Sequence, residues 1–175
     1  MLKIHSGIYK GQKIARVHSK TTKETASMVR EAVFNSLFKI SGHVLDLFAG
    51  SGSYGITAIS LGANKATFVD NNFKAYKTVN SNLEKLNIKA DVFLSDYQTF
   101  LNKNTTKFDL IFLDPPYNFK NYEQLLNGLS NHLNENAKIV LEIDKKTQLN
   151  NDEINFNKSK EKVYGSKKVI IYDCL

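Results

Sequence analysis

Cysteine, proline and tryptophan are scarce or missing: the 175 residues contain one cysteine, two prolines and no tryptophan. Cys174, near the C-terminus, is the one cysteine. Because a single cysteine has no second thiol to pair with, the chain can form neither a disulfide framework nor a thiolate zinc site. No stretch has the length of a transmembrane helix, and residues 1–7 lack the apolar core of a signal peptide. Internal repeats and long linkers are also absent. We therefore expect one cytoplasmic domain, with at most a small appendage.

Acidic residues are missing from the first 23 residues, although the rest of the chain contains 17 of them. The net charge is +7 and the pI is about 9.3, a balance that favours a nucleic-acid partner. We predict that residues 1–23 form a basic arm, with a short hairpin around Gly7 and Gly11. The expected RNA-binding residues are Lys10, Lys13, Arg16, Lys20, Lys23 and Arg30.

Strand and helix patterns alternate after an expected first helix at residues 24–39. The expected strands are 44–48, 66–69, 92–94, 108–113 and 138–142, and the expected helices are 53–61, 73–86, 97–101 and 122–133. Two more strands, 163–164 and 169–172, surround Gly165, while residues 144–160 show no clear pattern. This order predicts an α/β fold with a mostly parallel sheet and an antiparallel C-terminal strand. Ligands should bind at the carboxyl ends of the strands.

The two prolines are adjacent, in the tetrapeptide Asp114-Pro115-Pro116-Tyr117 that directly follows an expected strand. Asp114 is a hydrogen-bond acceptor at neutral pH, and Pro115 offers a carbonyl without an N–H. Each proline restricts the residue before it, so the acceptors point in fixed directions. Tyr117 supplies an aromatic face for a nucleobase. The tetrapeptide predicts a catalytic site for the exocyclic amine of a base; a rigid turn that closes a buried strand is the alternative.

A glycine-rich loop, Asp46-Leu47-Phe48-Ala49-Gly50-Ser51-Gly52, follows an expected strand and opens a helix. Such a loop permits a tight turn, and the helix N-terminus presents free N–H groups. Asp70 ends the next strand, where its carboxylate can accept both hydroxyl groups of a ribose. The pattern Gly50-x-Gly52-x-x-Gly55, with an acid about 20 residues further on, also fits the dinucleotide fingerprint. This region alone therefore leaves the cofactor open between NAD and S-adenosylmethionine.

Two acids favour S-adenosylmethionine. Asp46 can hold an ammonium group and would repel a pyrophosphate, and Asp114 offers acceptors to an amine substrate at the same sheet edge. Asp96 ends a third strand, where it can accept from an adenine amino group or cap the next helix, and both readings stay open. The expected cofactor-binding residues are Asp46, Phe48, Ala49, Gly50, Gly52, Asp70, Asn71, Asp96 and Tyr97.

With these motifs the chain resembles the bacterial methyltransferases that modify the exocyclic N2 of guanine 966 in 16S ribosomal RNA. The likeness covers nearly the whole chain and includes the segments 7–14, 29–35, 46–52, 114–117 and 162–165. The chain departs from the family pattern at Glu24, Ser27 and Met28, where the family usually has Pro, Asp and Arg. The resemblance implies a Rossmann-like seven-stranded methyltransferase domain at residues 24–175. It also implies S-adenosylmethionine as donor and the ribosomal RNA of an assembling small subunit as partner, without a metal or a membrane.

The expected reaction is methyl transfer to guanine N2, in which Asp114 and the Pro115 carbonyl accept the amine hydrogens. Pro116 and Tyr117 complete the expected catalytic set, with Tyr117 stacking on a base that has left its helix. A DNA adenine N6-methyltransferase is the main alternative, although 175 residues leave little room for a target-recognition region. A non-catalytic RNA-binding protein and an NAD-dependent oxidoreductase are the others. The intact tetrapeptide argues against the former, and the lack of a histidine proton relay argues against the latter.

Overall fold

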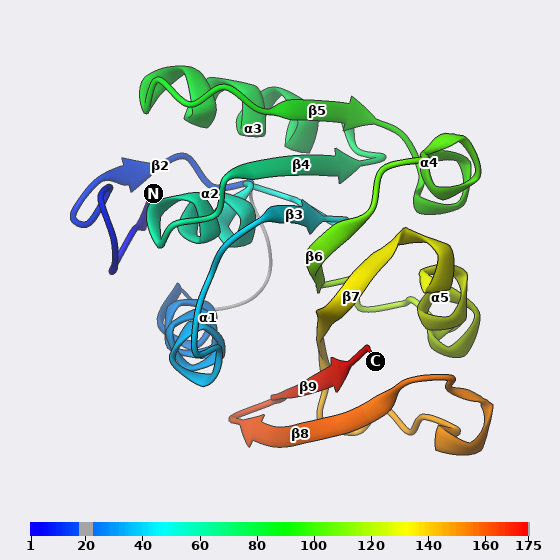
Figure 1. The fold of residues 1–175 in the computed structure, drawn as a ribbon. Coiled ribbons are helices and arrows are strands. Elements are labelled where there is room, and N and C mark those ends of the chain that lie inside the picture. The colour runs from blue at the N-terminus through cyan, green and yellow to red at the C-terminus, as the bar shows by residue number, and fades with distance from the viewer. Residues whose placement is uncertain (18–22, 175) are drawn as a thin grey trace.

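A seven-stranded sheet forms the centre of the molecule, in the order β5-β4-β3-β6-β7-β9-β8 (Figure 1). The structure is a computed structural model that describes residues 1–17 and 23–174, without the side chains of residues 23–26. The strands are β3 (His43–Asp46), β4 (Lys65–Asp70), β5 (Asp91–Leu94), β6 (Phe108–Leu113), β7 (Leu133–Asp144), β8 (Asn157–Tyr164) and β9 (Lys167–Asp173). β9 is antiparallel to β7 and β8, and the remaining pairs are parallel. The predicted fold class is confirmed.

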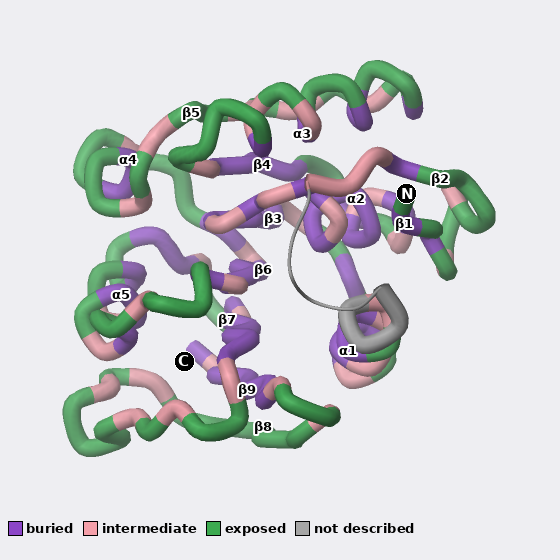
Figure 2. Tube along the Cα trace, turned by 180° about the vertical axis from the view of Figure 1, so that it is seen from behind, coloured by how far each residue is buried: buried purple, intermediate pink, exposed green. Residues whose placement is uncertain are grey.

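Helices cover both faces of the sheet. α1 (Lys23–Ser36), α2 (Ser53–Ser60) and α3 (Phe73–Lys85) pack on one face, and α4 (Tyr97–Lys103) and α5 (Tyr122–Gly128) pack on the other (Figure 1). The central strands are buried between these layers, whereas the edge strand β8 is exposed (Figure 2). No helix in the described part of the chain is long and apolar enough to cross a membrane.

The predicted N-terminal hairpin is present. β1 (Leu2–Lys3) pairs antiparallel with β2 (Lys13–Ile14). Leu2, Ile4 and Ile14 are buried in the same core cluster as the residues under α1, α2 and α3. The hairpin thus shares the core of the sheet domain, and a boundary at residue 23 remains a proposal that rests on charge.

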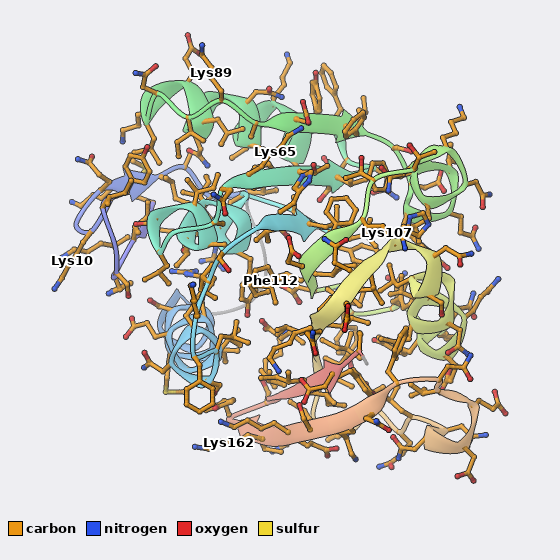
Figure 3. All side chains as sticks on the ribbon, in the orientation of Figure 1. Lys10, Lys65, Lys89, Lys107, Phe112 and Lys162 are labelled. Carbon is orange, nitrogen blue, oxygen red and sulfur yellow. The ribbon has the colours of Figure 1, made fainter. Side chains whose placement is uncertain are left out.

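The tip of the hairpin lies at the amino ends of the parallel strands. The Ile8 N–H donates to the Ser60 carbonyl at 2.9 Å, and the Tyr9 N–H donates to Ser60 Oγ at 2.9 Å. Ser60 ends α2, which starts at the carboxyl end of β3 and returns to the opposite edge of the sheet. Lys10 lies beside this contact and points outward (Figure 3). It is therefore at the amino ends of the parallel strands, whereas Asp46 and Asp114 are at the carboxyl ends.

The predicted helix at residues 122–133 is wrong in its second half. Leu129 and Leu133 are both buried and lie four residues apart, a spacing that mimics a helix. Instead α5 ends at Gly128, a 3₁₀ turn η1 (Ser130–His132) follows, and Leu133 opens β7 by pairing with Phe108 of β6. Strand pairing has overridden local propensity here.

Residues 144–160, which the sequence left unassigned, contain a second 3₁₀ turn, η2 (Asn151–Glu153), and the first half of β8. Residues 157–163 of β8 are all exposed. An edge strand without a buried face shows no alternation of apolar and polar residues, which explains why the pattern was not visible.

Gly55 of α2 allows the helix to approach β4 closely. A Cβ at this position would lie 2.3 Å from Phe68 Cε1, and both residues are buried. We expect Gly55→Ala to lower the free energy of unfolding by about 1–3 kcal/mol, the usual cost of overpacking. Denaturant unfolding measures the effect. Gly128→Ala in α5 is the matched control, because its Cβ would meet only Leu101 Cδ1 at 3.9 Å. Similar losses in the two variants would contradict the packing explanation.

Candidate active site

Three acids lie at the carboxyl ends of three adjacent strands. Asp46 ends β3, Asp70 ends β4, and Asp114 directly follows β6. β3 pairs with both β4 and β6, so the topology brings the glycine loop and the tetrapeptide to one edge of the sheet. This is the edge at which open α/β sheets bind their ligands.

Asp70 holds the glycine loop in place. Its Oδ2 accepts a 2.8 Å hydrogen bond from the Gly50 N–H, and its Oδ1 accepts one of 2.8 Å from the Asn72 N–H. Gly50 has φ +55°, a conformation that favours glycine, and no atom lies within 4 Å of the place where a Cβ would be. The loop therefore leaves open space in front of Gly50, as a ligand that approaches the backbone closely requires.

Asp46 is buried beneath the loop. It is 3% exposed, and its Oδ2 accepts a 2.9 Å hydrogen bond from the Gly55 N–H. Burial is the main cause that raises the pKa of Asp46 to about 8, and the Gly55 hydrogen bond opposes it. Asp46 thus fixes the first turn of α2, and its contact with an ammonium group stays a prediction. The loop residues that face a cavity are Phe48, Ala49, Gly50, Ser51 and Ser53.

Asp96 caps α4. Its Oδ1 accepts a 2.8 Å hydrogen bond from the Thr99 N–H, which lowers the pKa of this exposed carboxyl group. The capping interpretation is confirmed, and the adenine contact stays a prediction. The Tyr97 ring lies 5.8 Å from Phe48 and 5.7 Å from Phe119, so Tyr97 and Phe48 form part of one aromatic cluster beside the loop. Asn71 is exposed directly after Asp70.

Asp114 lines two cavities. One, of about 230 Å³, lies between the glycine loop and Asp114 and is also lined by Arg16, Arg30, Tyr54, Glu142 and Lys167. The other, of about 740 Å³, is formed by the whole tetrapeptide together with Tyr122 and Lys167. Pro115 is buried, whereas Pro116 is exposed and Tyr117 is 90% exposed. An exposed ring beside an acceptor at a cavity mouth is suited to a flat aromatic ligand.

A charged network that the sequence did not reveal surrounds Asp114. Lys167 Nζ lies 3.2 Å from Glu142 Oε1 and 3.6 Å from Asp114 Oδ1. The Tyr54 hydroxyl donates to Glu142 Oε2 at 2.6 Å. Desolvation by the surrounding protein, followed by the negative charge of Glu142, raises the pKa of Asp114 against the opposing effect of Lys167, although 41% of the side chain stays exposed. One signal was present in the sequence: Glu142 is a lone acid within the otherwise apolar run 139–143.

The predicted RNA-binding residues do not form one surface. Arg16 lines the smaller cavity, and Arg30 is buried in its wall, 5% exposed, where it donates to the Lys3 carbonyl at 3.2 Å. Burial lowers the pKa of Arg30. Arg30 is thus a buried wall residue of this cavity, and its contact with RNA stays a prediction. Lys10 and Lys13 are exposed near the amino ends of the parallel strands, away from the two cavities. Lys20 lies outside the described residues, as does the side chain of Lys23.

Comparisons with known proteins agree over almost the whole length. The family described as conserved hypothetical protein 95 matches residues 2–173. YlbH of Bacillus subtilis strain 168 is 36% identical, over 98% of this chain and 98% of its own. The ribosomal RNA small subunit methyltransferase D of Haemophilus influenzae is 34% identical, over 94% of this chain and 89% of its own. The solved structure of yhhF from Escherichia coli superimposes with a TM-score of 0.83 at 27% identity, over 98% of this chain and 97% of its own. The chain therefore belongs to the conserved hypothetical protein 95 family, the methyltransferase family that its motifs indicate.

Proposed function

We propose that the protein transfers a methyl group from S-adenosylmethionine to the exocyclic N2 amine of a guanine in 16S ribosomal RNA, at the position numbered 966. The observation that carries the proposal is the placement of Asp114. Its carboxylate lines both cavities, next to the exposed Tyr117 and across from the glycine loop. Relatives named ribosomal RNA small subunit methyltransferase D supply the class of substrate.

The loop Phe48–Gly52 and Asp70 are the residues that would hold S-adenosylmethionine, which supplies an electrophilic methyl group when it is bound. The open space in front of Gly50 fits such a group, because a Cβ placed there would meet no atom within 4 Å other than those of its chain neighbours. Asp70 already uses both oxygens on backbone N–H groups, and each carboxylate oxygen has a second lone pair for a ribose hydroxyl. These residues orient the donor toward Asp114, and the orientation itself accounts for a large part of catalysis.

Asp114 and the Pro115 carbonyl act on the substrate amine. The lone pair of a guanine amine is delocalised into the ring, so the amine is a poor nucleophile. Acceptors placed on both hydrogens favour the pyramidal nitrogen and its developing positive charge. With the donor bound, the new N–C bond would form as the S–C bond of the donor breaks, and the amine would lose one proton toward the Asp114 carboxylate or water. Tyr117 offers its exposed ring to the base.

A methyl-transfer assay tests this function directly. Small-subunit particles without the modification, free 16S rRNA and duplex DNA are each incubated with labelled S-adenosylmethionine, and the modified nucleoside is identified. We expect N2-methylguanosine from one of the two rRNA substrates. N6-methyladenine from DNA would support the adenine methyltransferase instead. Binding of RNA without any transfer would support the non-catalytic alternative.

The basic arm gives a separate prediction about RNA affinity. Arg16 lies at the smaller cavity, whereas Lys10 and Lys13 lie toward the far edge, so we expect Arg16→Ala to weaken RNA binding more than Lys10→Ala/Lys13→Ala. Loss of one phosphate contact should flatten the log–log salt slope by about 0.7–0.9. Fluorescence anisotropy over a salt series measures the slope, with the exposed pair Lys89→Ala/Lys103→Ala as control. A larger change in the Lys10/Lys13 variant would show that the RNA extends to the hairpin tip.

A further inference from the structure

Lys167 stands between the two carboxylates of the candidate active site. It opens β9, where it pairs with Asp144, so the antiparallel last strand brings it to the carboxyl edge of the sheet. Its Nζ lies 3.2 Å from Glu142 Oε1 and 3.6 Å from Asp114 Oδ1, and its side chain is only 22% exposed. Lys167 also lines both cavities. Lys167 thus lies where the smaller cavity, beside the glycine loop, meets the larger cavity, beside the tetrapeptide.

Glu142 serves as the anchor of this lysine. It is 6% exposed, and its two oxygens are used by different partners, with Oε2 accepting from the Tyr54 hydroxyl at 2.6 Å. Tyr54 is itself fixed by stacking on Phe112 of β6, with ring centroids 4.8 Å apart. The Tyr54–Glu142 pair therefore holds the Lys167 ammonium group against Asp114.

Asp114 is differently placed. The Asp114 carboxylate lies 3.6 Å from Lys167 Nζ. Its side chain is 41% exposed, toward the cavities. The carboxylate thus keeps lone pairs available for an amine, while its charge is balanced by a cation that already has a second partner. A neutral Asp114 would keep its carbonyl oxygen as an acceptor, but it would gain a hydroxyl donor and lose the negative charge that stabilises the positive charge developing on the amine.

We propose that Lys167 is a positioning residue for methyl transfer: anchored by Glu142, it holds the Asp114 carboxylate in place and in the ionised form that accepts the hydrogens of the substrate amine. The proposal rests on the proposed function of the site. Other charged or titratable groups lie around Asp114. They are Arg30 from α1, Tyr54 from α2, Asp46 from β3, Glu142 and Asp144 from β7, Tyr122 from α5 and Arg16 from the arm. Lys167 forms an ion pair with Asp114, with 3.6 Å between Nζ and Oδ1.

Electrostatics agree with this role. Desolvation by the surrounding protein and the charge of Glu142 raise the pKa of Asp114, whereas Lys167 lowers it. Burial would lower the pKa of Lys167, but Asp114 and Glu142 outweigh burial and hold the pKa above its ordinary value. Without the ammonium group, two carboxylates would face each other and Asp114 would take up a proton at higher pH.

The test compares Lys167→Met, which keeps the length and removes the charge, with Lys167→Arg, which keeps the charge. The titration of Asp114 is followed by NMR of protein labelled with ¹³C at the aspartate carboxyl groups, with Asp114→Asn to assign the signal. We expect Lys167→Met to move the Asp114 titration upward by about 1–3 pH units and Lys167→Arg to move it less. Because activity requires ionised Asp114, the acidic limb of the kcat pH profile should move upward by the same amount.

Lys168→Met is the matched control, since Lys168 is the next residue of β9 and contacts Thr147 and Glu161 instead. An unchanged Asp114 titration in a folded Lys167→Met variant overturns the proposal, as does an equal loss of kcat in both Lys167 variants with an unmoved acidic limb. If wild-type protein methylates no RNA, the proposed function fails, and the titration still decides whether Lys167 controls Asp114. Thermal unfolding and binding of S-adenosylhomocysteine show that each variant is folded.

Discussion

Replacing Asp114 by Ala or Asn should reduce methyl transfer to rRNA by about 100-fold or more, the scale of one lost transition-state hydrogen bond. Alanine removes the acceptor. Asparagine keeps one acceptor oxygen, but its amide group also brings donors that repel the amine hydrogens. Binding of S-adenosylhomocysteine should stay within a few-fold, because the loop is held by Asp70 and not by Asp114. Single-turnover kinetics with saturating RNA isolates the transfer step from binding.

Asp91→Asn is a suitable control for this loss. Asp91 opens β5 and therefore lies at the amino ends of the parallel strands, away from Asp114. There it forms an ion pair with Lys65 at 2.6 Å. We expect its transfer rate to stay near that of the wild type. Full turnover in folded Asp114→Ala would mean that the tetrapeptide is a rigid turn that closes β6, and the assigned catalytic roles would be abandoned.

Replacing Asp70 by Ala should weaken cofactor binding by roughly 10- to 150-fold, the equivalent of about 1.5–3 kcal/mol for hydrogen bonds to a charged group. Two effects contribute. The carboxylate would no longer accept the ribose hydroxyls, and the Gly50 N–H would lose the partner that fixes the loop. Calorimetry with S-adenosylhomocysteine measures the loss, and the same titration with NAD should show no binding by the wild-type protein.

A deoxy analogue separates the two effects of Asp70. S-adenosylhomocysteine that lacks a ribose hydroxyl should bind the wild type more weakly but lose little further in Asp70→Ala, since the two changes remove one shared contact. Fully additive losses would show that Asp70 acts only by anchoring Gly50. Tight binding of NAD, with no binding of S-adenosylhomocysteine, would instead support the interpretation of the site as a dinucleotide-binding site.

The fold could be predicted from the sequence because the patterns that indicate its strands and helices are local. Alternating strand and helix patterns predicted the parallel sheet, and residues at strand ends such as Asp46, Asp70 and Asp114 were placed at one edge by topology alone. Asp96 illustrates the limit of such reasoning. Its position after β5 predicted two roles equally, and the hydrogen bond to the Thr99 N–H confirmed the capping role.

The network around Asp114 could not be derived from spacing. Lys167, Glu142 and Tyr54 come from β9, β7 and α2, and they meet only because β9 enters the sheet antiparallel with one particular register. A shift of one residue would turn Lys167 to the other face of the sheet. The position of Lys10 was also out of reach, because it depends on where the hairpin tip docks on Ser60.

The smaller cavity is lined by residues from Leu2 to Lys167, almost the full span of the chain. Proteins are synthesised from the N-terminus onward, and a domain folds as a unit once its segments are available. During translation, the lining residues near Leu2 are therefore made well before β9, which contributes Lys167 to the same cavity. A growing chain has its basic arm long before it has a complete catalytic pocket. The smaller cavity is therefore complete only once β9 has joined the sheet beside β7.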